Sequence, residues 1–239
     1  MEALREGVPA SALLLAERID SDDRVKESLR LAAERGLPVM EAPRRELDRL
    51  TGEAPHQGVA LQVPPYQYAH PNDLLDRAVS TDAPALVVAL DGVTDPRNLG
   101  AVVRSAAAFG AHGVLVPERR SAGMTVAAWK TSAGAAARLP VARATNLARA
   151  LEAYRKAGLF VVGLAGDGGQ EIGALHLATE PLVLVTGSEG KGLSRVVREQ
   201  CDVVARIPIA GDVESLNASV AAGIALYAVA GARARAASG

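Results

Sequence analysis

The sequence predicts an α/β protein in which a small α/β domain precedes a larger domain built on a parallel sheet. From residue 84 onward, short apolar runs alternate with alanine-rich stretches of helical length, a pattern typical of βαβ units. Pro64-Pro65 interrupts the chain before that point, and proline neither donates a backbone hydrogen bond nor leaves its φ angle free. We therefore expect residues 1–66 to form the small domain, 67–83 a linker without regular structure, and 84–239 the large domain.

The composition is that of an ordinary globular protein. The chain has 239 residues, and its hydrophobic content of 49% is enough for a buried core. The single Cys201 excludes an internal disulfide and a cysteine metal cluster, and the four histidines lack the spacing of metal ligands. We therefore expect no metal. Because the sequence shows neither a signal sequence nor a long uncharged apolar span, we also expect a soluble cytoplasmic protein without a membrane segment.

Charge and aromatic content limit how this chain would bind nucleic acid. The formal net charge is −1, and residues 1–68 carry nine Lys or Arg against twelve Asp or Glu. Any surface that binds nucleic acid must therefore be a local patch. With two Phe, one Trp and four Tyr, extensive stacking on bases is not expected, so hydrogen bonds and phosphate contacts would dominate.

The elements follow in chain order. In the small domain, an amphipathic pattern predicts a helix over Arg24–Arg35, and alternation predicts a strand over Val59–Val63. In the large domain, four apolar runs predict buried parallel strands. These runs are Ala85–Leu90, Gly113–Val116, Leu159–Leu164 and Leu182–Val185.

Residues that favour helix ends delimit the helices between these strands. Asn98 is a candidate N-cap for a helix over Leu99–Phe109, and Gly110 is a candidate C-cap. Asn146 has the same place before a helix over Leu147–Lys156.

The last helix is predicted to begin at Asn217 or Ala218 and to reach Gly231. Its 220–229 stretch is almost wholly apolar, so we expect this helix to be buried or to lie at a subunit interface. The closing Arg233–Gly239 run is expected to fray.

Three loop motifs stand close together in the last third of the chain. They are Thr186-Gly187-Ser188-Glu189-Gly190-Lys191-Gly192, Arg206-Ile207-Pro208-Ile209-Ala210-Gly211 and Ser215-Leu216-Asn217-Ala218-Ser219. The first is not a P-loop, because Gly192 stands where the P-loop needs Ser or Thr. By itself it is equally well explained as a generic turn. Together the three loops follow expected strands, and ligand pockets of α/β proteins form at the carboxyl ends of strands.

A fourth motif upstream completes a recognisable set. With Asp91-Gly92-Val93-Thr94-Asp95-Pro96-Arg97-Asn98-Leu99-Gly100 and the following Arg104, the three loops resemble the SpoU family of RNA ribose 2′-O-methyltransferases. The resemblance covers about residues 85–230. It implies the knotted (trefoil) parallel-sheet fold of the SPOUT superfamily, S-adenosylmethionine as cofactor, and a homodimer with the active site near the subunit interface.

The resemblance also implies a role for each matching residue. It assigns to cofactor binding Thr186, Gly187, Ile207, Ile209 and Leu216. It assigns to the catalytic and substrate-facing set Asn98, Arg104, Glu189, Ser215 and Asn217. Helix capping is an alternative role for Asn98, Ser215 and Asn217, and a solvated helix charge is the alternative for Arg104.

The resemblance implies that Arg104 is the residue that activates the 2′-hydroxyl. A guanidinium stays protonated at accessible pH and is a poor base. We expect Arg104 to pair with an RNA phosphate and to stabilise the developing alkoxide electrostatically. Methyl transfer of this kind needs neither a metal nor a covalent intermediate.

The small domain carries a second, shorter resemblance. His56-Gln57-Gly58 resembles a segment of RlmB-type members, whose leading domain is an L30e-like RNA-binding module. This resemblance favours a guanosine of 23S ribosomal RNA as the target. Arg44, Arg45 and Arg49 are candidates for phosphate contacts, with a solvated helix face as the alternative. A strand common near the start of such domains is not evident before Met1-Glu2-Ala3-Leu4, so we expect the natural start to lie upstream.

Two other functions stay open at this point. The same chemistry on transfer RNA or on an antibiotic-resistance site of ribosomal RNA is one, because fold and pocket do not determine the target. A noncatalytic RNA-binding protein with the same fold is the other, although the retained Arg104, Glu189 and Asn217 argue against it.

Overall fold

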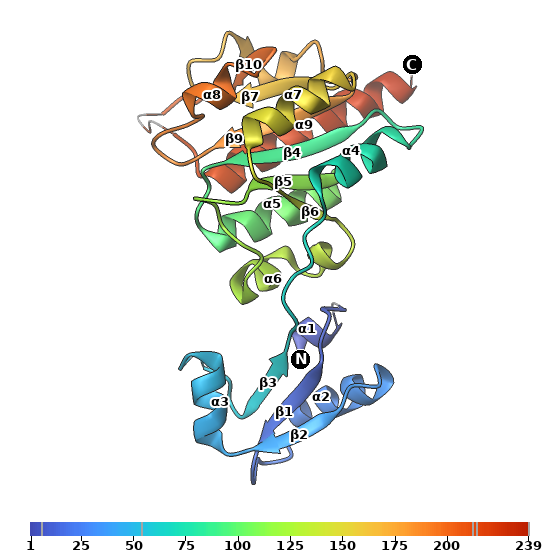
Figure 1. Ribbon diagram of the computed structural model, residues 1–239, viewed down its shortest axis with the longest axis vertical. Helices are drawn as coiled ribbons and strands as arrows, with labels where there is room; N and C mark the ends of the chain where they lie inside the picture. The colour runs from blue at the N-terminus through green and yellow to red at the C-terminus, as the bar shows by residue number, and fades with distance from the viewer. Residues whose placement is uncertain (6, 54, 212, 214, 239) are drawn as a thin grey trace. The chain divides into compact units, whose positions relative to one another are not determined.

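The computed structural model describes residues 1–5, 7–53, 55–211, 213 and 215–238, and these form two compact units. The first comprises Met1–Tyr66 and the second Gln67–Gly239 (Figure 1). Each unit has its own sheet and its own apolar core.

The small unit contains a three-stranded mixed sheet with helices beside it. Its elements are α1 (Glu2–Arg5), β1 (Ala12–Ala16), α2 (Asp23–Glu34), β2 (Val39–Ala42), α3 (Arg44–Thr51) and β3 (Val59–Gln62). The strand order is β2-β1-β3, with β2 parallel and β3 antiparallel to β1. Leu13 and Leu15 of β1 pack against Val25 and Leu31 of α2 in the core of this unit. The predicted helix and strand are confirmed to within one residue at each end.

The large unit contains seven strands, and every pairing among them is parallel. The strands are β4 (Leu86–Asp91), β5 (Gly113–Pro117), β6 (Val141–Ala144), β7 (Phe160–Leu164), β8 (Gln170–Glu171), β9 (Leu182–Gly187) and β10 (Val203–Arg206). Their order is β6-β5-β4-β9-β7-β10-β8. The predicted α/β fold with a parallel sheet is confirmed, and the four predicted strands are β4, β5, β7 and β9.

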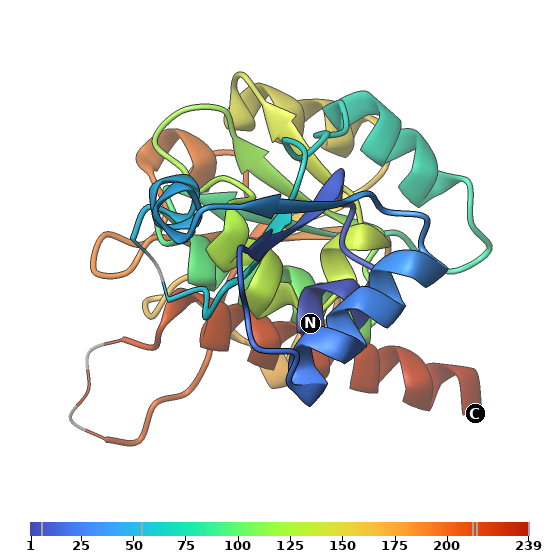
Figure 2. The same ribbon diagram turned by 90° about the horizontal axis from the view of Figure 1, so that it is seen from below.

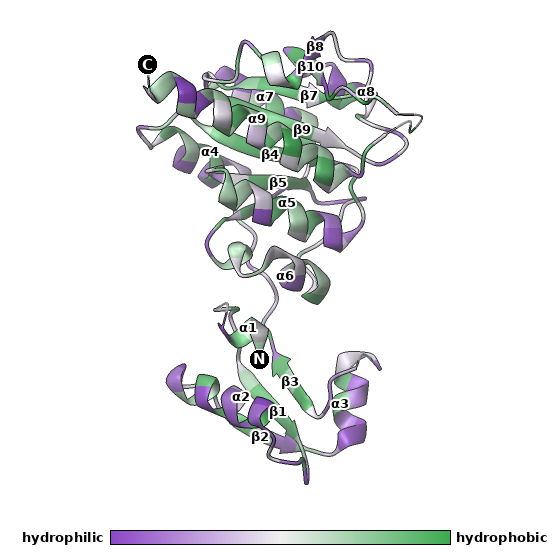
Figure 3. Cartoon of the chain, turned by 180° about the vertical axis from the view of Figure 1, so that it is seen from behind, coloured by the Kyte–Doolittle hydropathy of each residue, from purple (hydrophilic) through white to green (hydrophobic). Residues whose placement is uncertain are grey.

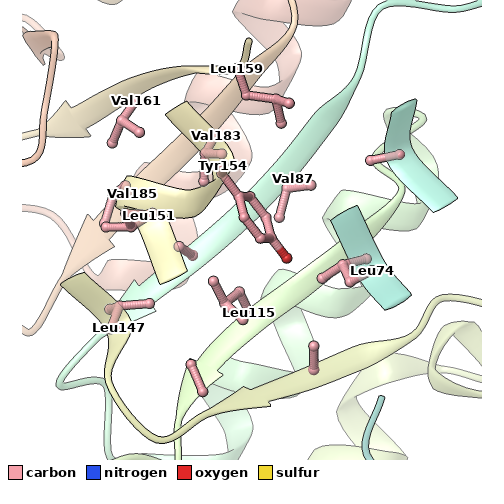
Figure 4. Packing of buried hydrophobic residues seen from close by; sticks show 14 of the residues in the cluster. Leu74, Val87, Leu115, Leu147, Leu151, Tyr154, Leu159, Val161, Val183 and Val185 are labelled. Carbon is pink, nitrogen blue, oxygen red and sulfur yellow. The ribbon is translucent and has the colours of Figure 1, made fainter. Parts of the chain in front are cut away.

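Helices cover both faces of this sheet. The helices of this unit are α4 (Pro71–Val79), α5 (Pro96–Ala108), α6 (Val126–Ser132), α7 (Leu147–Lys156), α8 (Arg195–Arg198) and α9 (Ala218–Ser238), with short 3-10 turns at Ala135–Ala137 and Ile172–Ala174. On one face, Tyr154 of α7 lies among Leu74, Val87 and Val183 (Figure 4). On the other face, α5 and α9 lie side by side (Figure 3). Because helices cover both faces of the sheet, the central strands are buried on both sides. This explains why their sequences are apolar throughout.

The expectation of an irregular linker over 67–83 is wrong, because α4 occupies most of it. Pro71 stands at the start of α4, where proline costs nothing, and the His70 Nδ1 atom accepts a hydrogen bond from the Asn72 amide at 3.2 Å. Leu74 and Ala78 are buried in the sheet's core. The Tyr154 hydroxyl also donates to the Pro71 carbonyl at 2.7 Å. Pro71 therefore marks a helix start, whereas Pro64 and Pro65 lie in the irregular segment before it.

The expected N-cap of α5 is also wrong. The helix begins at Pro96, and its N-cap is Asp95, whose carboxylate accepts from the Arg97 amide at 2.8 Å. Asn98 lies inside the first turn, so its side chain is available for other contacts. Gly110 follows the helix with a left-handed φ of 74°, as a C-terminal glycine should. Asn146 does cap α7, accepting from the Arg149 amide at 3.1 Å.

The last helix is longer than predicted and does not fray at Arg233. α9 runs as one helix to Ser238 (Figure 2). The half-buried Arg233 guanidinium donates to the carbonyls of Ala178, Glu180, Pro84 and Ala85 at 2.6–3.0 Å. Although α9 has the length and composition of a membrane span, one of its faces, including Leu226, is buried in the unit.

Candidate active site

A cavity of about 450 Å³ opens at the carboxyl ends of β7, β9 and β10. It is bounded by the loop after β7, the 186–193 segment and the chain between β10 and α9. All five residues that the resemblance assigns to the cofactor line it: Thr186, Gly187, Ile207, Ile209 and Leu216. The three loop motifs thus converge on one pocket.

Gly187 allows two chain segments to approach closely at the floor of this cavity. A Cβ atom on Gly187 would lie 2.1 Å from the Gly192 carbonyl carbon and 2.5 Å from the Leu193 nitrogen. The loop between them is closed by two backbone hydrogen bonds, Ser188 N to Gly192 O at 3.1 Å and Gly192 N to Ser188 O at 2.8 Å. Only glycine fits at this position without moving the loop.

Thr186 adds an unused polar group to the cavity wall. The residue is 3% exposed, and its hydroxyl oxygen has no hydrogen-bond partner among the described residues. A buried polar atom without a partner costs about 1–3 kcal/mol. A ligand with polar groups would remove this cost, so the wall fits a polar ligand such as a nucleoside.

Beside the cavity, three side chains from distant segments form a polar cluster. The Glu189 Oε1 atom accepts from Asn98 Nδ2 at 2.9 Å and from Asn217 Nδ2 at 2.6 Å. The Asn217 amide also donates to the Asn98 Oδ1 atom at 3.0 Å. The cluster joins the first turn of α5, the loop after β9 and the residue before α9. Glu189 also lines the cavity, so the cluster and the pocket form one site.

Asn217 serves the fold as well as the cluster. Its Oδ1 atom accepts from the Ser219 and Val220 amides at 2.9 and 3.2 Å, which is the bonding of a helix N-cap. The capping role left open by the sequence is therefore present together with the contact to Glu189. Ser215 lines the cavity.

The structure does not bring Arg104 to this cluster. Arg104 is exposed on α5, and its side chain has no hydrogen bond or ion pair among the described residues. Successive helix residues are rotated by about 100°, so Arg104 lies about 120° around α5 from Asn98. Within one chain, four of the five residues of the catalytic set lie at the cavity or in the cluster, and Arg104 does not.

The three arginines singled out in the small unit differ from one another. Arg49 is engaged with Glu46 through two hydrogen bonds of 3.0 and 2.6 Å. Arg44 and Arg45 are exposed, and no side-chain partner stands beside either in the described part of the chain. Arg44 and Arg45 are thus free for phosphate contacts, whereas Arg49 is already paired.

The His56-Gln57-Gly58 segment has a clear structural role. The buried His56 ring contacts the Asp48 carboxylate at 2.8 Å and accepts from the Gly58 amide at 3.0 Å. Gly58 has a φ of 80°, which favours glycine. These contacts hold the turn that leads into β3.

Sequence reasoning missed one charged pair on the cavity wall. Asp167 and Arg198 line the cavity and form two parallel hydrogen bonds of 3.0 Å. The hydrogen bond from Arg198 lowers the pKa of the Asp167 carboxyl group. The signal for Asp167 was the glycine-rich Gly166-Asp167-Gly168-Gly169 run directly after a predicted strand. No group of three or more His, Cys, Asp or Glu side chains suited to a metal occurs within the described ranges.

A pocket at the carboxyl edge of a parallel sheet is typical of α/β proteins that bind nucleotide-like ligands. Residues 85–227 match the model of the SpoU rRNA Methylase family, and residues 1–69 match the model for RNA 2'-O ribose methyltransferase substrate binding. The chain therefore belongs to the SpoU rRNA methylase family and is an RNA methyltransferase.

Relatives and solved structures agree with this family. An "Uncharacterized tRNA/rRNA methyltransferase" of Mycolicibacterium vanbaalenii is 61% identical over 230 residues, covering 96% of this chain and 73% of that protein. The structure of AviRb from Streptomyces viridochromogenes in complex with AdoMet has a TM-score of 0.74 and 29% identity, covering 98% of this chain and 86% of that one. An AdoMet-bound rRNA methyltransferase from Sinorhizobium meliloti has a TM-score of 0.72 and 27% identity, and the match covers 95% of this chain and 82% of that chain.

Proposed function

We propose that this protein transfers a methyl group from S-adenosylmethionine to a ribose 2′-hydroxyl of RNA. The observation that carries the proposal is the polar cluster of Asn98, Glu189 and Asn217 beside a cavity whose wall includes Gly187, where the 188–192 loop approaches too closely for a Cβ atom. The cavity wall suits the cofactor, because it offers the unpaired Thr186 hydroxyl and apolar side chains. Two structural neighbours were solved with AdoMet. When bound, S-adenosylmethionine supplies an electrophilic methyl group.

The side chains then have distinct roles. The Glu189 carboxylate holds the two amide groups of the cluster, so that the cluster presents a fixed surface to the ribose. Arg104 pairs with a phosphate of the RNA and stabilises the negative charge that develops on the 2′-oxygen. Its guanidinium does not take the proton, which leaves to the phosphate or to solvent.

The proposed target is a guanosine of 23S ribosomal RNA. Support comes from the substrate-binding match over residues 1–69 and from the solved rRNA methyltransferases. Transfer RNA is the alternative, because relatives are named tRNA/rRNA methyltransferases and an A. aeolicus TrmH/SpoU tRNA modifying enzyme is a structural neighbour. We expect the reaction to take place in the cytoplasm.

We further propose that the active form is a homodimer. Val220, Ile224 and Tyr227 of α9 are 37–68% exposed and line an open groove of about 440 Å³ against α5. Figure 3 shows apolar colour over much of α9. A contiguous apolar face of this kind commonly marks an interface. In a two-fold dimer each copy presents the same face, so the Arg104 missing from one cluster can come from the partner copy.

The test is site-resolved mapping of 2′-O-methylation on unmodified 23S ribosomal RNA with S-adenosylmethionine. One new site with the natural protein, and none with Arg104→Ala, is the expected result. No mark on ribosomal RNA, but a mark on transfer RNA, would assign the alternative target. No mark on either RNA would refute the proposed function.

Complementation tests the shared active site. Arg104→Ala and Asn217→Ala are each expected to be inactive. If Arg104 comes from the partner, random mixing gives about half heterodimers with one intact site each, and so about a quarter of natural activity. If Arg104 acts within its own chain, the mixture stays inactive.

A further inference from the structure

Four exposed cationic side chains lie on the loops and helices that follow β4 and β5, outside the cavity. They are Arg97, Arg119, Arg120 and Lys130, which we call the basic track. Building on the proposed function, we propose that the basic track binds phosphates of the RNA strand on the methyltransferase unit, in addition to any contact made by the small unit.

The fold places the four residues in neighbouring segments. β4 and β5 are parallel neighbours, so the loops that follow them leave the same edge of the sheet. The Ala122 amide donates to the Val93 carbonyl at 2.8 Å and ties these two loops together. Arg97 follows the first loop, and Arg119 and Arg120 belong to the second.

Lys130 belongs to α6, which crosses α5 at very short range. A Cβ atom on Gly100 would lie 2.3 Å from the Ala128 carbonyl oxygen and 2.8 Å from the Thr131 Cβ atom. Ala128 and Thr131 therefore form the side of α6 that faces α5, and the exposed Lys130 lies on another side of this helix, where it extends the track along α6.

These cations are not used by the protein itself. None of the four side chains has a hydrogen bond or an ion pair among the described residues. In contrast, near β7 and β10, Arg155 pairs with Asp202, Arg198 with Asp167 and Arg206 with Glu171. An unpaired guanidinium or ammonium group keeps all its donors for an external anion.

Three carboxylates stand near these cations, and each keeps its negative charge. Asp95 caps α5 through the Arg97 amide. Asp91 accepts from the Ser194 amide at 2.6 Å. Glu118 is the exposed carboxylate that adjoins the Arg119-Arg120 pair. The four cations of the track exceed these three carboxylates by one, which gives a small local excess of positive charge on a chain whose overall charge is −1.

Arg120 is held in an unusual backbone conformation, with a φ of 56°. A non-glycine residue in this region costs of order 1 kcal/mol or more and persists when the surrounding structure imposes it. This conformation fixes the turn at which Arg120 is exposed.

The track also continues toward Arg104, the cation that the proposed function assigns to an RNA phosphate. Arg104 lies seven residues after Arg97, on nearly the same side of α5. Cations on two loops and two helices suit a polyanion with repeated phosphates, whereas a single small anion would need donors that converge on one point.

The experiment compares Arg119→Gln/Arg120→Gln with the natural protein and with Arg149→Gln/Lys156→Gln. The control also removes two cations from the methyltransferase unit, but on α7, which covers the other face of the sheet. Binding of a 23S ribosomal RNA fragment and of a tRNA transcript is followed by fluorescence anisotropy at several KCl concentrations. S-adenosylmethionine affinity is measured by calorimetry on the same samples.

The slope of log K against log[KCl] is negative, and we expect the track variant to reduce its magnitude by about 2, while the control leaves the slope unchanged. Its S-adenosylmethionine affinity should equal that of the natural protein, and its KM for RNA should rise more than its kcat falls. If the natural protein methylates RNA and the track variant keeps its salt slope and its KM for RNA, the basic track is overturned and the proposed function is left intact. A natural protein that binds neither RNA refutes both. Binding to anionic lipid vesicles that depends on the track, with RNA binding unchanged, assigns the cations to a membrane surface and also overturns the inference.

Discussion

Replacing Gly187 by alanine should damage the cofactor pocket in a measurable way. The added Cβ would lie 2.1 Å from the Gly192 carbonyl carbon and 2.3 Å from its oxygen. Carbon atoms in contact stay about 3.5 Å apart, so the 188–192 loop must move by roughly 1.4 Å. Overpacking of this kind costs about 1–3 kcal/mol. If the cost falls on the ligand-bound loop, the Kd for S-adenosylmethionine rises about five- to 150-fold.

The assay is calorimetric titration of Gly187→Ala with S-adenosylmethionine, together with the Tm of the free protein. Gly169→Ala is the matched control, because a Cβ there meets no atom within 4 Å and its φ is not left-handed. The control should bind like the natural protein. Natural affinity and natural Tm in Gly187→Ala would refute the reasoning, since the loop would then yield without cost or lie away from the ligand.

Three further changes test the cluster and the framework. Glu189→Gln keeps the size but replaces an acceptor by a donor, so kcat for RNA methylation should fall at least about tenfold, as measured by methyl transfer from labelled S-adenosylmethionine. Burial lowers the pKa of His112 below its usual 6.5, and its Nδ1 atom accepts from the Leu86 amide. The neutral His112 ring makes its whole contribution to the free energy of unfolding above pH 6.5, and this contribution is lost as the pH falls through the lowered pKa. His112→Gln should therefore flatten the dependence of Tm on pH between about 7.5 and 5. Arg233→Met removes four hydrogen bonds to carbonyls and should cost about 2–4 kcal/mol in urea unfolding, with the exposed Arg235→Met as control.

The sequence predicted the central strands because their environment leaves a strong pattern. β4 and β9 are buried on both faces, and each is an unbroken apolar run. β6 and β8 have four and two residues, too few for any periodicity to show. The trefoil knot implied by the family resemblance stays a prediction.

The errors at helix ends have one physical origin. Pro71 and Pro96 both stand in the first turn of a helix, where a missing amide hydrogen costs nothing. Treating the 67–83 segment after Pro64-Pro65 as an irregular linker hid α4, and treating Asn98 as the cap moved the start of α5 past Asp95. Arg233 looked like part of a fraying end, because its partners are carbonyls 53 to 149 residues away in sequence.

The pocket was easier to predict than its charged wall. The three loop motifs are local in sequence, and parallel strands bring their carboxyl ends to one edge, so convergence follows from topology. The Asp167–Arg198 pair joins residues 31 apart through side chains alone. A single sequence contains no local pattern for such a pair.

Arg104 shows that closeness in a motif differs from closeness in a site. Six residues separate it from Asn98, a spacing that matches the family pattern yet turns the side chain about 120° around α5. The Glu189 cluster, in contrast, unites residues 91 and 28 positions apart. If Arg104 acts on the same ribose, either α5 must rotate or a second copy must supply the guanidinium. Rotation of α5 would break its close crossing with α6 at Gly100, where backbone and side chain leave no room for a Cβ atom. The second copy requires no such change, and the exposed apolar side of α9 offers it a surface.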